Sequence, residues 1–450
     1  MSGYRRRPGR AVLGEGGASR GAARRRVGRL LAGGAAVLTA LPILVACSGP
    51  ADRAVVRVPE DVATISEAVA AVQEDGLVLV GPGVYREEVL VETPGVTIRG
   101  LDRNDTVVDA DGKRPYGIVG VADGITIENL TVTGATFYGV LITGMHSDEA
   151  GPTARGSSDY TSLDPDEFPP LQRFLVDRVT AYNNGLYGIY AFDANNGVIR
   201  NSYASGSADS GFYVGQCREC NILVENNRAA DNAVGFENAN ASDSVWVIGN
   251  DFSGNRIGMT FLSNYQEAFA PQRENWVAGN IVTDNVSSES PSHAQGGWGI
   301  GIGLSGASEN SFERNLIAGN PTAGVLLDSA EDLAAAGNAF LQNRFERNGT
   351  DIVNASSDRA SASGNCVDGS VTALPSDLIE RCSGMQPAVS KSEFPWPEAP
   401  DGTSYLRVPK PDPQESKLVS ERSPEPLPRQ ITRPDPSTVR LPSLSTAGTR

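Results

Sequence analysis

Two acids and one arginine are the residues of this chain best suited to acid–base chemistry. Asp209 lies in a bend at residues 207–211, and Glu237 follows 28 residues later. If residues about two dozen apart stack on neighbouring turns of a repeating fold, their carboxyl groups would be separated by about 5 to 9.5 Å, the range that glycosidases use. Arg256 would then be their electrostatic partner. The alternative is that Asp209 only caps its own turn.

A series of aromatic and polar side chains next to these acids is expected to face outward. The aromatic rings would stack on the C–H faces of sugars, while carboxylate and amide groups would bind hydroxyls. The alternative is that they are ordinary surface residues. The predicted ligand-binding residues are Tyr190, Phe192, Asp193, Tyr213, Gln216 and Asn240.

Three insertions flank this strip, at residues 146–173, 263–275 and 287–297. The first two follow equivalent strands four repeats apart, so at about 4.8 Å per repeat they would wall a cleft of about 20 Å. The third insertion precedes its strand and would cover one side. We therefore predict a ligand groove with Tyr190, Tyr213 and Glu237 on its floor.

An internal sequence repeat predicts the strands that carry these residues. The glycines at 188, 211, 235 and 258 are spaced by 23, 24 and 23 residues. Self-similarity of this length is the mark of a solenoid, in which stacked repeats share one core. An asparagine followed five positions later by another recurs at Asn227/Asn232, Asn250/Asn255, Asn280/Asn285, Asn315/Asn320 and Asn343/Asn348.

Each repeat has the pattern of strands. Short runs such as 245–248 alternate apolar residues, and no window between 120 and 370 keeps a helical period over ten residues without a glycine or asparagine. We predict an all-β parallel β-helix of about ten coils, with asparagine ladders in its bends. The residues expected to face the core after each repeat glycine are Val140, Ile189, Phe212, Phe236, Met259, Ile300 and Val325.

The start of the solenoid carries a capping box, Thr64 with Glu67, which predicts a short amphipathic helix over the open end of the core. From this helix through Gly81–Glu87 to Val96–Gly100, the sequence resembles the opening of right-handed parallel β-helix proteins of the pectin-lyase-like superfamily, pectin methylesterases in particular. Together with the repeats, the resemblance covers nearly all of residues 55–382. It implies the fold, because these residues build the cap and the first coils.

The catalytic motifs of those families are absent. Pectin methylesterases use two aspartates with an arginine and glutamines, and polygalacturonases use Asn-Thr-Asp, Asp-Asp, Gly-His-Gly and Arg-x-Lys motifs. This sequence has no Asp-Asp and no Gly-His-Gly, and Lys113 is its only lysine between residues 51 and 390. The repeats also resemble periplasmic β-helix proteins that help mature copper enzymes. His146 and His293 are the only histidines, so we see no cluster of soft copper ligands and assign no metal site.

The two ends of the chain differ from the solenoid. Nine arginines, an apolar run at 30–45 and Leu44-Val45-Ala46-Cys47 resemble a bacterial lipoprotein signal peptide with Cys47 as the lipidated residue. An uncleaved anchor helix is the alternative, and the arginines also loosely match a twin-arginine export signal. Residues 383–450 hold 13 of the 28 prolines, which predicts disorder.

The predicted organisation is a signal peptide at 1–46, a linker at 47–54, the β-helix at 55–382 and a proline-rich disordered tail at 383–450. The protein would be exported and lipid-anchored to the cell membrane, facing the extracytoplasmic side. Such a protein would oxidise its remaining cysteines in two local pairs, Cys217 with Cys220 and Cys366 with Cys382. A redox or metal-binding C-x-x-C is the alternative for the first pair, but no second C-x-x-C is present.

The net charge of the predicted mature domain limits which polymers it can bind. Without the nine basic residues and one acid of the signal and the nine basic residues and eight acids of the tail, residues 47–382 hold 20 basic and 45 acidic residues, a net charge of −25. Such a surface repels nucleic acid, and it repels acidic polysaccharides unless calcium bridges the carboxylates. Calcium is therefore the one cofactor considered, and a monomer is expected.

Three function classes follow. The first is a non-catalytic envelope lipoprotein whose β-helix presents a groove for a glycan or another envelope component. The second is a polysaccharide-active enzyme, a lyase, esterase or epimerase, that uses the acids beside the tyrosines. The third is a periplasmic maturation factor for metal enzymes.

Overall fold

The computed structural model describes residues 53–147, 151–152, 163–369, 371–375, 380–382, 396–417, 420–422 and 426–443. The chain divides into two compact units, Met1–Ser48 and Gly49–Arg450, and the description below concerns the second. The predicted signal peptide, the lipidation site Cys47 and most of the linker lie outside the described residues.

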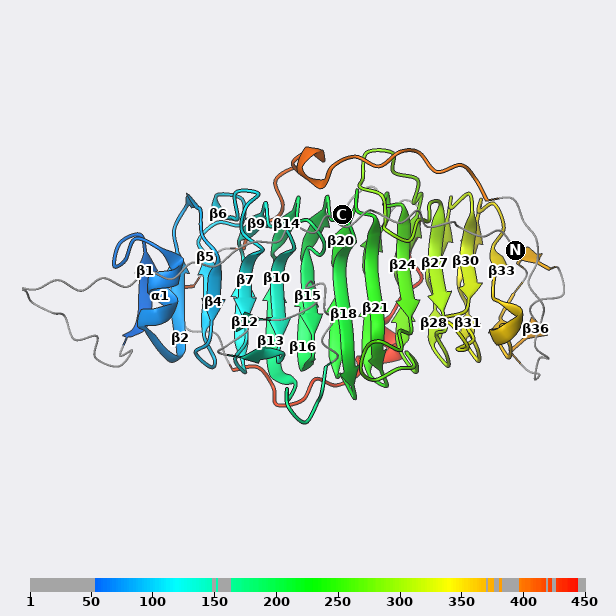
Figure 1. The fold of residues 1–450 in the computed structure, drawn as a ribbon, viewed down its shortest axis with the longest axis horizontal. Coiled ribbons are helices and arrows are strands. Elements are labelled where there is room, and N and C mark those ends of the chain that lie inside the picture. The colour runs from blue at the N-terminus through cyan, green and yellow to red at the C-terminus, as the bar shows by residue number, and fades with distance from the viewer. Residues whose placement is uncertain are drawn as a thin grey trace, which may run out of the picture. The chain divides into compact units, whose positions relative to one another are not determined.

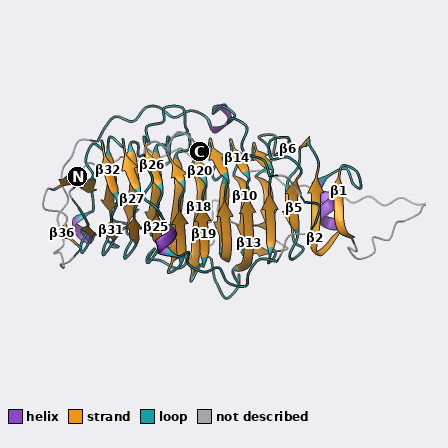
Figure 2. Cartoon of the chain, turned by 180° about the vertical axis from the view of Figure 1, so that it is seen from behind, coloured by secondary structure: helices purple, strands orange, loops and turns teal. Residues whose placement is uncertain are grey.

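Within the described residues, three long sheets form a solenoid (Figure 1), and every strand pair along them is parallel. Because each sheet takes one strand from nearly every coil, residues one repeat apart become hydrogen-bonded neighbours. The view from behind shows the same arrangement with little helix (Figure 2). This confirms the predicted parallel β-helix, whose crossovers are right-handed as the twist of the strands requires.

The 13-stranded sheet consists of β1 (Arg53–Val58), β2 (Val72–Val80), β5 (Thr97–Gly100), β8 (Ile125–Glu128), β13 (Leu171–Asp177), β16 (Ala194–Arg200), β19 (Ile222–Glu225), β22 (Val245–Ile248), β25 (Trp276–Ala278), β28 (Ser311–Glu313), β31 (Ala339–Leu341), β34 (Cys366–Val367) and β36 (Glu380–Arg381). The 11-stranded sheet consists of β4 (Val89–Val91), β7 (Tyr116–Gly120), β10 (Tyr138–Thr143), β15 (Ile189–Phe192), β18 (Ser210–Arg218), β21 (Val234–Ser242), β24 (Ile257–Leu262), β27 (Ile300–Ser305), β30 (Ala323–Asp328), β33 (Ile352–Asn354) and β35 (Ala373–Leu374). The 10-stranded sheet consists of β3 (Gly83–Tyr85), β6 (Thr106–Asp109), β9 (Thr131–Thr133), β14 (Thr180–Tyr182), β17 (Tyr203–Ser205), β20 (Arg228–Ala229), β23 (Asp251–Phe252), β26 (Ile281–Thr283), β29 (Leu316–Ala318) and β32 (Arg344–Glu346). The remaining elements are the antiparallel pair β11 (His146–Ser147) and β12 (Gly151–Pro152), the helix α1 (Ile65–Ala71) and the 3-10 turns η1 (Asp358–Ala360), η2 (Tyr405–Arg407) and η3 (Pro436–Thr438).

The predicted register of the 11-stranded sheet is confirmed over most of its length. Ile189, Phe212, Phe236 and Met259 are aligned partners in successive strands, and all four belong to the main core. The outward positions Tyr213, Glu237 and Thr260 are aligned in the same way.

The prediction was wrong for one core position, Ile300. Met259 pairs with Ile302, and Ile302 pairs with Val325, so Ile302 rather than Ile300 faces the main core. The reason is close packing between coils: a Cβ on Gly258 would lie 2.6 Å from the carbonyl oxygen of Gly301. Gly301, not Gly299, is therefore the glycine of this repeat.

The repeated asparagines form the predicted ladders. Asn227, Asn250, Asn280, Asn315 and Asn343 are joined in sequence by amide-to-carbonyl hydrogen bonds of 2.9–3.0 Å between their side chains. The second member of each pair forms a parallel ladder with bonds of 3.0–3.4 Å. A third ladder, through Asn310, Asn338 and Asn365, was not predicted. These buried amides satisfy one another and fix the bends of the coils.

Helix α1 has the capping box expected from Thr64 and Glu67, with both of its reciprocal hydrogen bonds present. Its buried residues Ile65, Ala68 and Val69 belong to the same core cluster as the strands. The helix lies beside β1 and β2 at the first coil (Figure 1).

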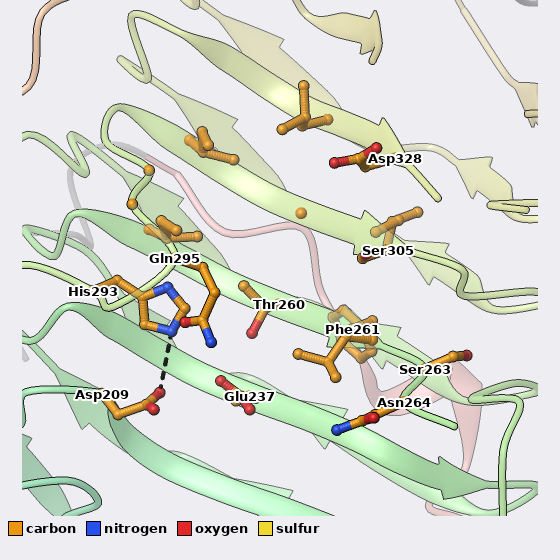
Figure 3. A pocket seen from close by; sticks show the side chains of 18 of the residues that line it. Asp209, Glu237, Thr260, Phe261, Ser263, Asn264, His293, Gln295, Ser305 and Asp328 are labelled. Atoms are coloured by element: carbon orange, nitrogen blue, oxygen red, sulfur yellow. Dashed lines mark ion pairs between the residues drawn. The ribbon is translucent and has the colours of Figure 1, made fainter. Parts of the chain in front are cut away.

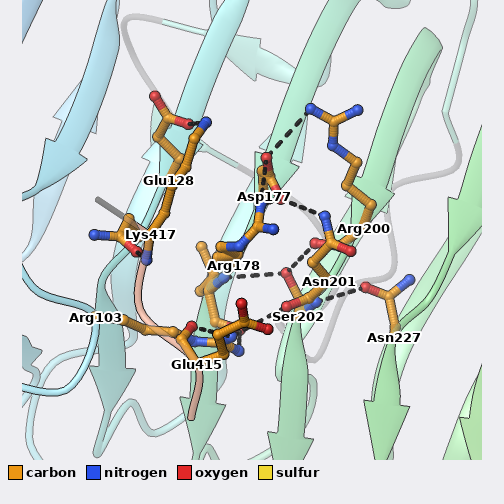
Figure 4. Close-up of polar contacts among 12 residues, drawn as sticks. Arg103, Glu128, Asp177, Arg178, Arg200, Asn201, Ser202, Asn227, Glu415 and Lys417 are labelled. Carbon is orange, nitrogen blue, oxygen red and sulfur yellow. Dashed lines mark hydrogen bonds and ion pairs between the residues drawn. The ribbon is translucent and has the colours of Figure 1, made fainter. Parts of the chain in front are cut away.

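The described parts of the tail pack on the solenoid, and the disorder of residues 383–450 as a whole stays a prediction. Thr403 N donates to the carbonyl of Ser290, Asn183 Nδ2 donates to the carbonyl of Val408, and Lys417 Nζ lies 3.6 Å from Glu128 (Figure 4). The tail therefore runs back along the solenoid toward its first coils.

After this run the tail reverses and crosses the 13-stranded sheet. Ile431 and Val439 join a cluster with the outward tryptophans Trp246 and Trp276, and the Arg433 guanidinium lies 4.1 Å from the Trp276 ring centroid. The solenoid supplies an apolar and hydrogen-bonding surface that the tail alone lacks, which offsets the entropy lost on ordering it.

Candidate functional site

The predicted tyrosine strip is not exposed, which corrects the expectation of an open groove floor. Tyr190 and Tyr213 are 0% exposed and Phe192 is 2% exposed. Their rings pack together, with the centroids of Tyr190 and Tyr213 4.6 Å apart. The first two insertions cover them through Leu163, Phe168, Ala268 and Phe269. Pointing away from the coil did not mean exposure to solvent, because the insertions form a second apolar cluster over the strip.

The polar residues at the end of the strip are buried as well. Asp193, Gln216 and Asn240 all have a positive φ and are 0% exposed. Gln216 Oε1 accepts from the backbone N–H of Ala268, and Asn240 Nδ2 donates to the carbonyl of Asn264, so both hold the second insertion. Among the described residues, neither carboxylate oxygen of Asp193 has a hydrogen-bond partner, and burial raises the pKa of Asp193 to about 7. Gln216 and Asn240 therefore anchor a loop here, and none of the three side chains presents a ligand surface.

The pocket lies instead over the later coils (Figure 3). It has a volume of about 700 Å³ and is lined by residues of β21, β24, β27 and β30, by Asp209, by the second and third insertions and by Trp396 of the tail. The third insertion thus covers one side of the site, as expected. The lining polar residues are Asp209, Glu237, Thr260, Ser263, Asn264, His293, Gln295, Ser305 and Asp328.

Asp209 and Glu237 are brought together at one end of this pocket with His293. His293 Nε2 lies 3.4 Å from Asp209 Oδ1 (Figure 3), and one ligand atom from each of the three residues lies within 4.8 Å of the others. Ser210 Oγ lies 3.1 Å from Asp209 Oδ1 and 3.0 Å from Glu237 Oε2, so its hydroxyl connects the two carboxylates. The predicted pairing of the two acids across neighbouring coils is present.

The electrostatics of this group favour a protonated histidine. Burial lowers the pKa of His293, but the contact with Asp209 and the charges of Asp209 and Glu237 outweigh it and place the pKa above its ordinary value. A raised pKa favours the imidazolium form, which can donate a proton, and the carboxylates beside it can accept one.

Arg256 does not serve as the partner of the acids, contrary to prediction. Its guanidinium donates to Ser290 Oγ at 3.2 Å and to the carbonyls of Pro400 and Asp401 at 2.7 and 2.9 Å. Arg256 therefore ties the tail to the third insertion, and desolvation by burial lowers its pKa.

His293 was missed as a site residue. It lies 56 residues after Glu237, in an insertion outside the repeat, so register gave no reason to place it beside the acids. The available signal was its rarity, since it is one of two histidines in an insertion already expected to border the site.

The described residues provide few soft ligands for copper. All four cysteines after Cys47 are in disulfides, Cys217–Cys220 and Cys366–Cys382, which confirms both predicted pairs. Met145 and Met259 are buried in different clusters. Only the nitrogen and oxygen donors of Asp209, Glu237 and His293 form a cluster that fits a metal ion in the described residues.

Comparison with known proteins agrees with this fold. A family model described as periplasmic copper-binding protein (NosD) matches residues 76–295, which include Asp209, Glu237 and His293. No curated protein matches the sequence. In the described part of the chain, no helix combines the length and apolarity that a membrane span needs.

Similar solved structures include the A-module of a mannuronan C-5 epimerase of Azotobacter vinelandii, with 18% identity over 69% of this chain and 83% of that chain and a TM-score of 0.42. A pectate lyase has 15% identity over 79% of this chain and 84% of that chain, with a TM-score of 0.37. A pectin methylesterase of Erwinia chrysanthemi has 13% identity over 58% of this chain and 78% of that chain, with a TM-score of 0.27. By its three parallel sheets and its sequence, this chain is a right-handed parallel β-helix protein that is similar over residues 76–295 to the NosD family of periplasmic copper-binding proteins.

Proposed function

We propose that this protein is an exported β-helix protein that binds a glycan in the pocket over β21, β24 and β27. The observation that carries the proposal is the lining of this pocket, which combines the exposed ring of Trp396 with carboxylate, amide and hydroxyl groups. A volume of about 700 Å³ is in the range of sites that hold small ligands. Rings of this kind stack on sugars while the polar groups bind hydroxyls.

One hydroxyl group in the pocket, that of Thr260, is available to a ligand. Thr260 Oγ1 is buried and has no hydrogen-bond partner among the residues that the structure describes, and Thr260 is aligned with Glu237 on the next strand. Since buried hydroxyls are normally paired, a ligand hydroxyl would satisfy it.

Replacing Trp396 by alanine is expected to weaken glycan binding about tenfold, because a lost aromatic stack costs on the order of 1 to 1.5 kcal/mol. The protein would be titrated calorimetrically with neutral and acidic glycan oligosaccharides, with and without calcium. Leu406→Ala is the matched control, since Leu406 is a similarly exposed apolar residue of the tail outside the pocket lining. Equal loss in both variants, or binding by no glycan, would contradict the proposal.

A catalytic role is the second candidate, and the His293–Asp209 contact beside Glu237 favours it. The carboxylate of Glu237 would accept a proton from the bound sugar, and the imidazolium of His293, held by Asp209, would donate one to a leaving or developing oxyanion. Such chemistry belongs to a polysaccharide lyase, esterase or epimerase.

Glu237→Gln is then expected to lower turnover at least 100-fold while glycan affinity changes little, because proton transfer by a positioned base contributes about 10²–10⁴-fold. Products would be followed by chromatography and by NMR of the sugar protons. Glu289→Gln, an exposed acid of the third insertion outside the pocket lining, should leave turnover unchanged. If the wild-type protein binds a glycan but changes no bond in it, the binding role stands alone.

We further propose that Cys47 carries the lipid anchor. The support is its position after an apolar run and Leu44-Val45-Ala46. Metabolic labelling with a fatty-acid analogue should mark the wild-type protein and not Cys47→Ala.

A further inference from the structure

We infer that Asp209, Glu237 and His293 form a binding site for one first-row divalent transition metal ion, with Zn²⁺ as the simplest example. The inference concerns the residues themselves and does not depend on a glycan being bound. Its first support is chemical: one imidazole nitrogen and two carboxylate oxygens from three segments converge at one end of the pocket. Catalytic zinc sites have this arrangement, with three protein ligands and one open position.

The spacing of His293 and Asp209 also fits two ligands of one metal ion, which would bind after the imidazolium of His293 has released its proton. His293 Nε2 and Asp209 Oδ1 are 3.4 Å apart, beyond the usual 2.7–3.2 Å of an N–H···O bond. Ligands at about 2.0–2.2 Å from a tetrahedral zinc ion are separated from one another by about 3.3–3.6 Å. This pair therefore already has the spacing of two ligands. Glu237, within 4.8 Å of both, needs a shift of about 1 Å, which a side-chain rotation provides.

The supporting contacts hold the three ligands in place. Asp209 is fixed by its backbone N–H, which donates to the carbonyl of Leu186. Glu237 projects from β21 and is 5% exposed. The insertion that carries His293 is tied at its start, because Ser287 Oγ bonds Asp231 Oδ1 and the carbonyl of Ser290 accepts from the backbone N–H of Thr403 in the tail. Ligands that are positioned before the metal arrives bind it with less loss of entropy.

The negative charge of the pocket also favours binding of a cation. Asp209, Glu237 and Asp328 line it, and no lysine or arginine does so among the described residues. Arg256, the basic residue closest in sequence to this lining, bonds the tail and the third insertion instead. A divalent ion would neutralise the two carboxylates beside His293.

The donor set selects the type of ion. Calcium and magnesium prefer six or more oxygen ligands, and an imidazole nitrogen is not among their usual partners. Nitrogen with carboxylate oxygen suits zinc and Cu²⁺, and the Irving–Williams order places Cu²⁺ above zinc. Soft Cu⁺ is disfavoured, since no free thiol or thioether lines the pocket among the described residues.

The open position would face the pocket and Thr260. A metal-bound water or a ligand oxygen there would be close to the coil of Thr260, whose Oγ1 has no partner within the described part of the chain. The metal would then lie beside any bound sugar.

The test uses the full-length protein with its two histidines labelled with ¹⁵N, titrated with Zn²⁺ after treatment with a chelator. We expect one equivalent to bind with a Kd of about 10 µM or tighter and His293→Ala to weaken it about 100-fold. The imidazole signals of His293 should shift while those of His146 do not. His146→Ala is the matched control, because it removes the only other histidine and should leave the affinity unchanged.

Asp209→Asn and Glu237→Gln keep the size of the side chain and should each weaken Zn²⁺ at least tenfold. The denaturation midpoints of the metal-free variants, compared with wild type, show whether any of them fails to fold. The inference is overturned if no Zn²⁺ binds below 1 mM, if His293→Ala binds it as wild type does, if the signals of His146 shift instead, or if Ca²⁺ binds at least as tightly. Glycan titrations of the chelator-treated protein report on the proposed glycan binding separately.

Discussion

Replacing Asn280 by alanine is expected to lower the free energy of unfolding by about 4 kcal/mol, because each buried polar group left without a partner costs about 1–3 kcal/mol. Asn280 Oδ1 accepts from both the backbone N–H and the side-chain amide of Asn250, at 2.9 Å each. Its amide donates to the carbonyl of Val247 and to Asn315 Oδ1, also at 2.9 Å. Alanine removes all four bonds in the middle of a ladder where residue 280 is 0% exposed and water cannot replace them.

Asn343→Ala is the matched control, since Asn343 closes the same ladder at a half-buried position. There the loss should be about 1 kcal/mol, because solvent can reach the freed groups. Both values come from chemical denaturation followed by circular dichroism, with the midpoint and slope compared. Equal effects at the two positions would show that the ladder contributes no more inside the solenoid than at its end.

Asp193→Asn is expected to stabilise the protein at pH 8 by up to about 4 kcal/mol while changing little at pH 4. Burial without a partner raises the pKa of the Asp193 carboxyl from 3.8 to about 7 in the folded state. Between these values the folded state holds a proton that the unfolded state has released. The contribution of Asp193 to the free energy of unfolding is therefore highest below pH 4, falls by about 1.4 kcal/mol per pH unit as the pH rises toward 7, and levels off above it.

Asparagine cannot ionise, so the variant should lose this part of the pH dependence. Thermal and denaturant unfolding of both proteins from pH 4 to pH 8 would measure it. Glu60→Gln, at an exposed position, removes one negative charge without removing a buried carboxyl and should stay within about 0.5 kcal/mol of wild type. A wild-type curve parallel to that of Asp193→Asn would mean that Asp193 is ionised in the folded protein with a partner of its own.

The carboxyl of Asp193 lies beside the first insertion: a Cβ on Gly144 would be 2.8 Å from Asp193 Oδ2, and the backbone N–H of Leu171 donates to the carbonyl of Asp193. The predicted stability cost at neutral pH is therefore located where the insertions cover the tyrosines. Ionising a buried carboxyl costs free energy. The pH dependence of unfolding at this position therefore reports whether the insertion stays packed over Asp193.

The sequence alone determined the features that repeat. The asparagine ladders, the glycine spacing, the core positions Phe212, Phe236 and Met259 and both disulfides could be predicted, because stacking at one fixed register turns a period in sequence into a column in space. The same rule failed where the period is ambiguous. In the segment 299–302, Gly299-Ile300-Gly301-Ile302 allows two registers with the same alternation, and only the close approach of Gly301 to its neighbouring coils selects one.

Which segments cover the outside of the coils could be seen only in the tertiary structure. The outward tyrosines are buried because two insertions pack on them, and the proline-rich tail is held because Trp246 and Trp276 offer it an apolar surface. His293 reaches Asp209 from an insertion that has no repeat pattern. These contacts join segments with no common period, and their geometry depends on side-chain packing between distant parts of the chain, which alternation along a strand does not encode.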